Sequence, residues 1–135
     1  MKLKVLPSHD CFFIEAINDY PLTQDDPCVL NIIGQEFLKG SSDQPMSINH
    51  PEIKNPSMGI AQTIVELLNG EKYGSFVEYG AGDGETRSNT LYLERALEWE
   101  GILIEPDKQL FEQLLDKNRH VWAISTCLST TTKPQ

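Results

Sequence analysis

The sequence predicts an α/β fold in which three parallel strands are flanked by helices. Three short apolar segments lead to this expectation: residues 76–79, 102–104 and 121–124. Segments with helical periodicity separate them, which gives the order strand, helix, strand, helix, strand. Residues 102–104 form an uninterrupted apolar run, as is typical of parallel strands buried on both faces. Such strands are joined by right-handed crossovers.

One helix is expected in the first part of the chain. Asp26 is a favourable N-cap, Pro27 suits the first helical position, and Gly40 is a stop signal. The apolar residues of this helix share one face, which should dock on an apolar surface: Leu30, Ile33 and Phe37. Prolines and the polar segment 41–56 predict loops around it.

Three further helices are expected in the second part. Ser57 can cap the first and Asn69-Gly70 can end it, the second begins near Ser88, and Asp107 can cap the third. Their apolar residues fall at helical spacing. These are Ile60, Ile64, Leu67 and Leu68 in the first helix, Leu93, Ala96 and Leu97 in the second, and Leu110, Phe111, Leu114 and Leu115 in the third.

Length and charge narrow the class of protein. The chain has 135 residues, room for one domain, and its pattern changes near Pro56, so we expect a loop-rich segment at 1–54 and a regular α/β part at 55–135. Its formal net charge of −9 repels nucleic acid and anionic membranes. The apolar runs are too short for a membrane span, and the N-terminus does not resemble a signal peptide. We therefore expect a soluble chain without a nucleic-acid partner or membrane insertion.

The cysteines and histidines do not predict a metal site. They are scattered along the sequence without paired spacings: Cys11, Cys28, Cys127, His9, His50 and His120. A structural zinc site needs four nitrogen or sulfur ligands at short paired spacings. We therefore expect three ordinary thiols, buried or half-buried, and no metal.

The candidate chemistry is concentrated in a glycine-rich turn directly after the first strand. Its residues are Glu78, Gly80, Ala81, Gly82, Asp83 and Gly84. Glycines two residues apart let the backbone turn sharply and let a ligand approach without interference from a Cβ atom. A turn between a strand and a helix is where nucleotide-type cofactors bind in such folds. A tight turn without a ligand is the alternative.

Carboxylates around this turn favour a cationic cofactor. Glu78, Asp83 and Glu85 would repel the pyrophosphate of a dinucleotide, and Glu85 occupies a position where the dinucleotide fingerprint has glycine. S-adenosylmethionine has a sulfonium and an ammonium group and no phosphate, so it fits better. Glu78 is placed to meet its amino acid moiety directly or through water.

Glu105 is a second candidate cofactor ligand. It follows the apolar run of the second strand, where a carboxylate can accept both hydroxyl protons of a ribose. S-adenosylmethionine and NAD both carry such a ribose. The alternative is that Glu105 only supports the turn into the helix capped by Asp107.

Several short motifs follow one another between residues 55 and 129. They are Asn55-Pro56-Ser57-Met58-Gly59, Phe76-Val77-Glu78, Gly80-Ala81, Asp83-Gly84-Glu85, Ser88-Asn89-Thr90-Leu91, Leu93-Glu94, Trp99, Ile104-Glu105-Pro106, Lys117-Asn118-Arg119 and Cys127-Leu128-Ser129. In this order they closely resemble the opening half of the FkbM-type S-adenosylmethionine-dependent methyltransferase domain, particularly its animal Star-like subgroup. The resemblance implies a Rossmann-like class I methyltransferase fold, truncated here to the N-terminal half of the domain.

For a complete member, the resemblance implies transfer of a methyl group from S-adenosylmethionine to an acceptor that the sequence does not identify. It also implies an alternative of another class. Star-like proteins are associated with secretory and endosomal trafficking, in which a methyltransferase-like fold can act as a non-catalytic scaffold. The family thus points to the endoplasmic reticulum, Golgi or endosome, although we expect no membrane anchor from this sequence.

The chain departs from the family at three places. Gly82 stands where an aromatic residue is common, and Ser125-Thr126-Cys127 replaces the acidic residue that often holds adenine, so adenine contacts are unassigned. The sequence stops at Gln135, before the strands that line the acceptor pocket and supply any general base. We therefore assign no catalytic residue and expect the isolated chain to be inactive. The outer edge of strand 76–79 should lack its neighbour, which makes it a candidate surface for a protein partner.

Overall fold

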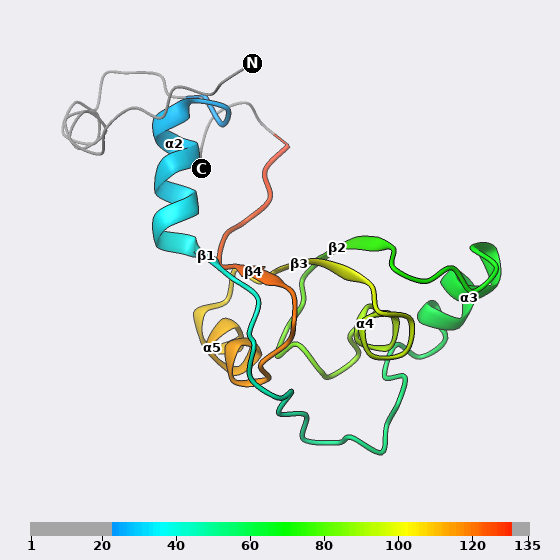
Figure 1. The fold of residues 1–135 in the computed structure, drawn as a ribbon. Coiled ribbons are helices and arrows are strands. Elements are labelled where there is room, and N and C mark those ends of the chain that lie inside the picture. Colours follow the sequence, from blue (N-terminus) through cyan, green and yellow to red (C-terminus); the bar gives the residue numbers. More distant parts are fainter. Residues whose placement is uncertain (1–22, 131–135) are drawn as a thin grey trace. The chain divides into compact units, whose positions relative to one another are not determined.

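The structure is a computed structural model that describes residues 23–130 (Figure 1). The chain divides into two compact units, one of which is Lys39–Cys127, and residues 23–38 and 128–130 are the described part of the other. The structural division thus falls earlier than the expected boundary after residue 54. Residues 39–54 belong to the larger unit because they bond to it. The Ser42 N–H donates to the Arg119 carbonyl at 3.2 Å and the Ser47 N–H donates to the Lys117 carbonyl at 2.8 Å.

The smaller unit contains the first expected helix. This helix, α2 (Pro27–Ile32), has Asp26 as its N-cap, and an Asp26 side-chain oxygen accepts the Cys28 N–H at 2.8 Å, as the sequence predicts. The helix continues as a π-helical turn, η1 (Ile33–Phe37), which the sequence does not predict. The chain becomes extended at Leu38, before the expected stop at Gly40.

The sheet has four strands: β1 (Leu38–Lys39), β2 (Ser75–Tyr79), β3 (Glu100–Ile104) and β4 (Trp122–Ile124). Their order is β1-β4-β3-β2. The pairs β2·β3 and β3·β4 are parallel, which confirms the expected relation of the three main strands. The expectation of a purely parallel, three-stranded sheet is wrong, because β1 adds a fourth strand and makes the sheet mixed. With two residues, β1 is too short to show a period in the sequence.

Three helices accompany these strands: α3 (Ile60–Leu67), α4 (Leu91–Leu97) and α5 (Lys108–Asp116). Asp107 caps α5 by accepting the Leu110 N–H at 2.9 Å, as predicted. Helix α4 begins at Leu91, later than the expected start near Ser88, and Thr90 is its N-cap. Figure 1 shows α4 and α5 on the same side of the strands.

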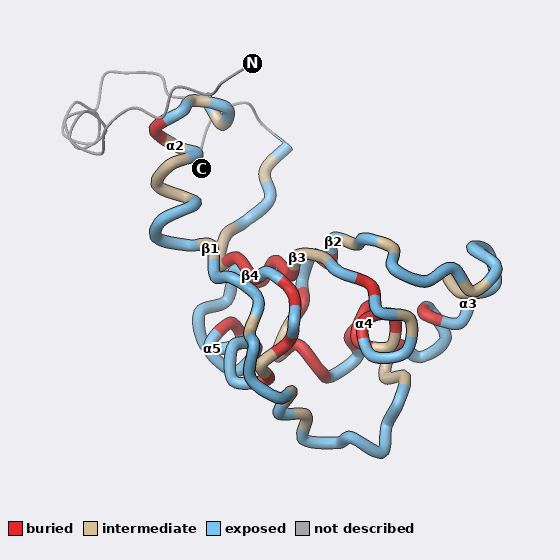
Figure 2. Tube along the Cα trace, in the orientation of Figure 1, coloured by how far each residue is buried: buried red, intermediate tan, exposed pale blue. Residues whose placement is uncertain are grey.

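Two apolar clusters form the core. One joins β3 and β4 to α5 and contains Ala81, Leu103, Phe111, Leu114, Val121 and Ala123. The other joins α3 to α4 and contains Ala61, Leu93 and Trp99. Gly101 in β3 permits the close approach of β2, because a Cβ atom there would lie 2.4 Å from the Phe76 carbonyl oxygen. Figure 2 shows the buried residues on the inner strands and on the sides of the helices that face them.

Apolar side chains remain exposed on the sheet and on α3. On the sheet, Val77 is 67% exposed and Trp122 is 51% exposed, and β2 has a strand on one edge only. On α3, the buried residue is Ala61, whereas Ile60 and Leu67 are exposed. The sequence pattern therefore predicted the helix, but its N-cap is Gly59 rather than Ser57, and its expected apolar face is buried only in part.

Candidate glycine-turn site

The glycine turn lies at the carboxyl ends of β2 and β3, as expected. The N–H groups of Gly80 and Ala81 both donate to the Ile104 carbonyl, at 2.9 and 3.1 Å. Gly80, Gly82 and Gly84 have φ values of 71°, 60° and 77°, which favour glycine. A Cβ atom on Gly80 or Gly82 would meet no atom within 4 Å, so this side of the turn is open to a ligand.

Gly84 has a different role from the other two glycines. A Cβ atom on Gly84 would lie 3.1 Å from the Leu114 side chain, so this glycine lets the turn pack against α5. The neighbouring Ala81 is 3% exposed and belongs to the same core cluster. Gly84 and Ala81 therefore fix the turn to the core, and Gly80 and Gly82 form the part that a ligand can approach.

Glu105 ties the end of β3 to the turn. One carboxylate oxygen accepts the Gly82 N–H at 2.7 Å, and the other accepts the Asp107 N–H at 2.9 Å. The side chain is buried. The bond from Asp107 is the one expected if Glu105 supports the turn into α5. The bond from Gly82 places the same carboxylate at the candidate cofactor site. Its contact with a ribose stays a prediction.

Glu78 is buried beside the start of α4 and accepts three hydrogen bonds. The donors are the Asn89 N–H at 2.7 Å, the Ser88 hydroxyl at 3.0 Å and the Thr90 hydroxyl. Helix α4 follows these donors directly, and the Ser88 hydroxyl also accepts the Leu91 N–H at 3.1 Å. A ligand amino group could reach Glu78 only by sharing its oxygens with these donors. Contact with the cofactor through water, rather than directly, is the expectation that fits this arrangement.

Arg119 connects the elements of the site, a role that the sequence pattern does not predict. Its guanidinium donates to the Gly84 carbonyl at 2.9 Å, to the Ser88 hydroxyl at 3.1 Å and to the Thr90 hydroxyl at 3.1 Å. It also pairs with the Glu94 carboxylate at 2.6 Å, and both side chains are buried. Arg119 thus joins the start of β4, the turn and α4. The signal in the sequence is Lys117-Asn118-Arg119, three polar residues directly before a buried strand.

Lys117 neutralises Glu85, so this carboxylate adds no net charge to the glycine turn. The Lys117 ammonium lies 2.8 Å from the Glu85 carboxylate, and both side chains are buried. The same carboxylate accepts the N–H groups of Asn49 at 2.9 Å and His50 at 2.6 Å. Burial alone would raise the pKa of Glu85, but these hydrogen bonds and the Lys117 charge outweigh it and hold the pKa below its ordinary value. Counting Glu85 as a free charge of the turn was therefore wrong.

Asp83 is the more accessible carboxylate of the turn. It accepts the N–H groups of Glu85 at 2.9 Å and Thr86 at 2.7 Å, and the Thr86 hydroxyl at 2.7 Å. Burial would raise the pKa of Asp83, but these bonds and the charge of Lys117 lower it below its ordinary value. Asp83 is thus ionised at neutral pH and gives the turn a negative charge.

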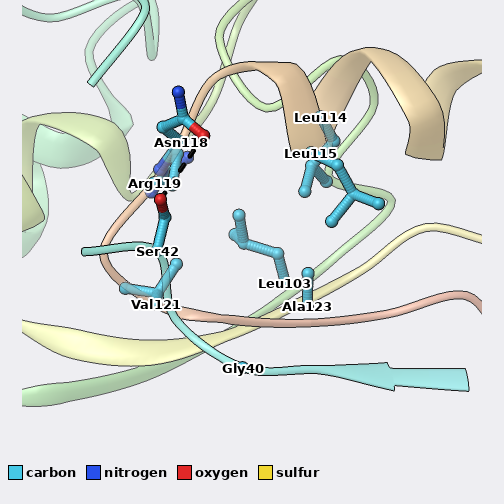
Figure 3. Close-up of a pocket in the computed structure, with 9 residues that line it drawn as sticks. All are labelled: Gly40, Ser42, Leu103, Leu114, Leu115, Asn118, Arg119, Val121 and Ala123. Carbon is cyan, nitrogen blue, oxygen red and sulfur yellow. Dashed lines mark hydrogen bonds between the residues drawn. The ribbon is translucent and has the colours of Figure 1, made fainter. Parts of the chain in front are cut away.

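Two cavities adjoin these elements. The smaller, of about 40 Å³, lies between α5, β4 and residues 40–42, and Figure 3 shows Arg119 and Asn118 at one end with leucines at the other. It has little more space than a water molecule needs. The larger, of about 450 Å³, begins where the glycine turn ends. Its lining residues are His50, Ile53, Asn55, Pro56, Met58, Glu85, Thr86 and Arg87.

The cysteines differ from the expectation. Cys28 is disulfide-bonded rather than a thiol, and Cys127 is a free thiol that is exposed rather than buried. Cys11 and His9 lie outside the described residues. Within residues 23–130 no three acidic, histidine or cysteine side chains are grouped in a way that could hold a metal ion. In the same range, no helix combines the length and apolar character needed to cross a membrane.

The comparisons with known proteins add no relative. No family model, curated protein or solved structure matches the chain.

Proposed function

We propose that this chain is the cofactor-binding half of an S-adenosylmethionine-dependent methyltransferase domain of FkbM type. One observation carries the proposal: the open side of Gly80 and Gly82 lies outside the carboxyl ends of two adjacent parallel strands, with Glu105 bonded to the Gly82 N–H. Ligands of open α/β sheets bind in this position. The motif series from residue 55 to residue 129 supports the same reading.

The charges of the turn favour a cofactor with a cationic centre. Asp83 is ionised and only partly buried, whereas the charge of Glu85 is neutralised by Lys117. An ionised, partly accessible carboxylate beside the glycines attracts a sulfonium or ammonium group and repels a pyrophosphate. Asp83 would therefore contribute most to repelling the pyrophosphate of a dinucleotide, and Glu78 and Glu105 would add to this repulsion.

When bound, S-adenosylmethionine would supply a sulfonium methyl group for transfer to an acceptor oxygen or nitrogen, and S-adenosylhomocysteine would be the leaving group. The residues of this chain bind and orient the cofactor, which contributes through proximity. Glu105 would share its oxygens between the Gly82 N–H and the ribose hydroxyls, and Glu78 would act through water. We assign no general base to this chain.

Titration calorimetry of the 135-residue chain tests this proposal. We expect saturable, one-site binding of S-adenosylmethionine and no binding of NAD at the same concentrations. Asp83→Asn should weaken S-adenosylmethionine binding, because it removes the accessible charge. Asp116→Asn is the matched control, since Asp116 is an exposed aspartate at the end of α5. Equal affinity for both ligands, or equal loss in both variants, would contradict the proposal.

A second candidate function is a Star-like scaffold in secretory or endosomal trafficking, and two observations favour it. The Cys28 disulfide suits an oxidising compartment such as the lumen of the secretory pathway. The free edge of β2, with the exposed Val77, is a candidate surface for a protein partner. A chain that does not bind S-adenosylmethionine in the calorimeter but keeps a cooperative fold would support the scaffold.

A further inference from the structure

The larger cavity combines an apolar wall with one uncompensated cation. Ile53, Pro56 and Met58 supply the apolar side, and Ile53 and Met58 are 48% and 82% exposed. Its volume of about 450 Å³ falls within the usual range for small-molecule sites, roughly 300 to 1,000 Å³. Exposed apolar side chains around a concave surface of this size are typical of a binding site.

The charges around the cavity are unequal. Glu85 is neutralised by Lys117, and the His50 ring lies 3.3 Å from the Glu52 carboxylate. Arg87 is exposed and forms no hydrogen bond or ion pair with any described residue. In a chain with a net charge of −9, the cavity therefore offers a free guanidinium to an anion.

Backbone strain marks the same two loops. Met58 and Arg87 both line the cavity, and both are non-glycine residues in the left-handed region, with φ values of 55° and 58°. Side chains with a Cβ atom are disfavoured there. Glycine would relieve the strain at either position, yet the chain has a long apolar and a long cationic side chain.

The walls of the cavity are fixed by the network around Glu85. Its carboxylate binds the main-chain N–H groups of Asn49 and His50 on one wall and belongs to the loop that forms the other. On the first wall, the Asn55 side chain accepts hydrogen bonds from the main chain and hydroxyl of Ser57. The cavity walls are thus held by part-buried hydrogen bonds.

We propose that this cavity binds an amphipathic monoanion, with its apolar body against Ile53, Pro56 and Met58 and its anionic group on Arg87. One wall of the cavity is formed by Glu85, Thr86 and Arg87, the residues that directly follow the glycine turn in the sequence. That this molecule is the methyl acceptor rests on the proposed function. The presence of the site does not.

Amide chemical-shift titrations of the full chain test this inference, with octanoate as the anionic probe and octylammonium as a probe of the same length and opposite charge. We expect octanoate to shift the amides of Ile53, Thr86 and Arg87 saturably, and octylammonium to leave them unchanged. Equal responses to both probes would overturn the proposal. So would shifts centred on Val77 and Trp122, or no saturable response.

Two variants separate binding from folding. Arg87→Gly and Met58→Gly each remove a contact to the probe and also relieve a left-handed residue. We expect both to keep a melting temperature at or above that of the parent, with octanoate binding weakened at least about tenfold in Arg87→Gly. Lys72→Gln, which removes an exposed charge before β2, should leave binding unchanged. Undiminished binding in Arg87→Gly, or a lower melting temperature in both glycine variants, would contradict the inference.

The titrations contain no S-adenosylmethionine, so the two proposals fail separately. Octanoate binding without S-adenosylmethionine binding would refute the cofactor and keep the cavity. S-adenosylmethionine binding without octanoate binding would do the reverse.

Discussion

The Glu105 carboxylate accepts the Gly82 N–H at 2.7 Å, and this bond joins the end of one strand to the turn that follows its neighbour. Glu105 and Gly82 are 23 residues apart in the sequence. A charged side chain that is almost fully buried at the end of a strand has to be compensated, and here two main-chain N–H groups compensate it. The same bond places a carboxylate at the edge of the open turn.

Replacing Glu105 tests its double role. We expect Glu105→Ala to weaken S-adenosylmethionine binding by about 1.5 to 3 kcal/mol, the usual loss when a charged hydrogen-bond partner is removed. Glu105→Gln keeps one acceptor oxygen and should weaken binding less. Calorimetry measures both, and denaturant unfolding of the same variants shows how much of the loss comes from the turn. Equal affinity in Glu105→Ala and the parent would mean that the ribose is held elsewhere.

The buried pair of Lys117 and Glu85 should matter for stability. Glu85→Gln leaves the Lys117 ammonium buried without its counter-charge, so we expect the free energy of unfolding to fall by about 3 to 5 kcal/mol. Glu52→Gln is the matched control, because its side chain is 69% exposed and its pairing with His50 is open to solvent. The control should change stability by no more than about 0.5 kcal/mol. Similar losses in both variants, measured by urea unfolding, would contradict this reading of the pair.

Stability should fall on acidification. The folded pKa values of Asp83 and Glu85 lie below the ordinary values of 3.8 and 4.5, so both groups stabilise the fold when ionised. Their contribution is complete above the ordinary values and is lost as the pH falls through them toward the lower folded pKa values. We expect the free energy of unfolding to decrease between about pH 5 and pH 3, and less steeply in Glu85→Gln than in the parent. Parallel pH profiles for the two proteins would show that Glu85 is not responsible.

The free edge of β2 should make the chain associate. In β2, every second residue bonds to β3 through its main chain. The main-chain N–H and C=O groups of the residues between them face outward at this edge, namely those of Ser75, Val77 and Tyr79. We expect the parent to elute as concentration-dependent oligomers and Val77→Lys to shift toward the monomer, since a lysine opposes edge pairing. Leu67→Lys, at an exposed site on α3, is the control.

The parent should also melt at a modest temperature, because a small unit with an open edge buries a limited share of its surface. Circular dichroism melting measures this. A monomeric parent with a cooperative melt above about 60 °C would contradict both expectations.

Local patterns predicted much of this fold. The caps at Asp26 and Asp107, the three parallel strands and the position of the glycine turn all follow from residues close together in the sequence. The missed features depend on distant residues. Arg119 reaches Gly84 across 35 positions and Lys117 reaches Glu85 across 32, and no periodicity encodes such pairs.

The same limit explains the smaller errors. Directly before α4, Ser88 and Asn89 bond to Glu78, which lies on a neighbouring element, and β1 becomes a strand only through its place in the sheet. The buried face of α3 depends on which neighbours cover it, and Ile60, Leu67 and Leu68 of the predicted apolar face are exposed. Charge was also misjudged at Glu85, since the sequence does not show that Lys117 lies beside it.

The most direct test of the central claim is an amide chemical-shift titration of the 135-residue chain with S-adenosylmethionine. The account predicts saturable shifts at Gly80, Gly82 and Asp83 and at Glu105 across the turn, with the amides of Val77 and Trp122 unchanged. Saturation without shifts in the turn, or no response at a large excess of S-adenosylmethionine, would contradict it.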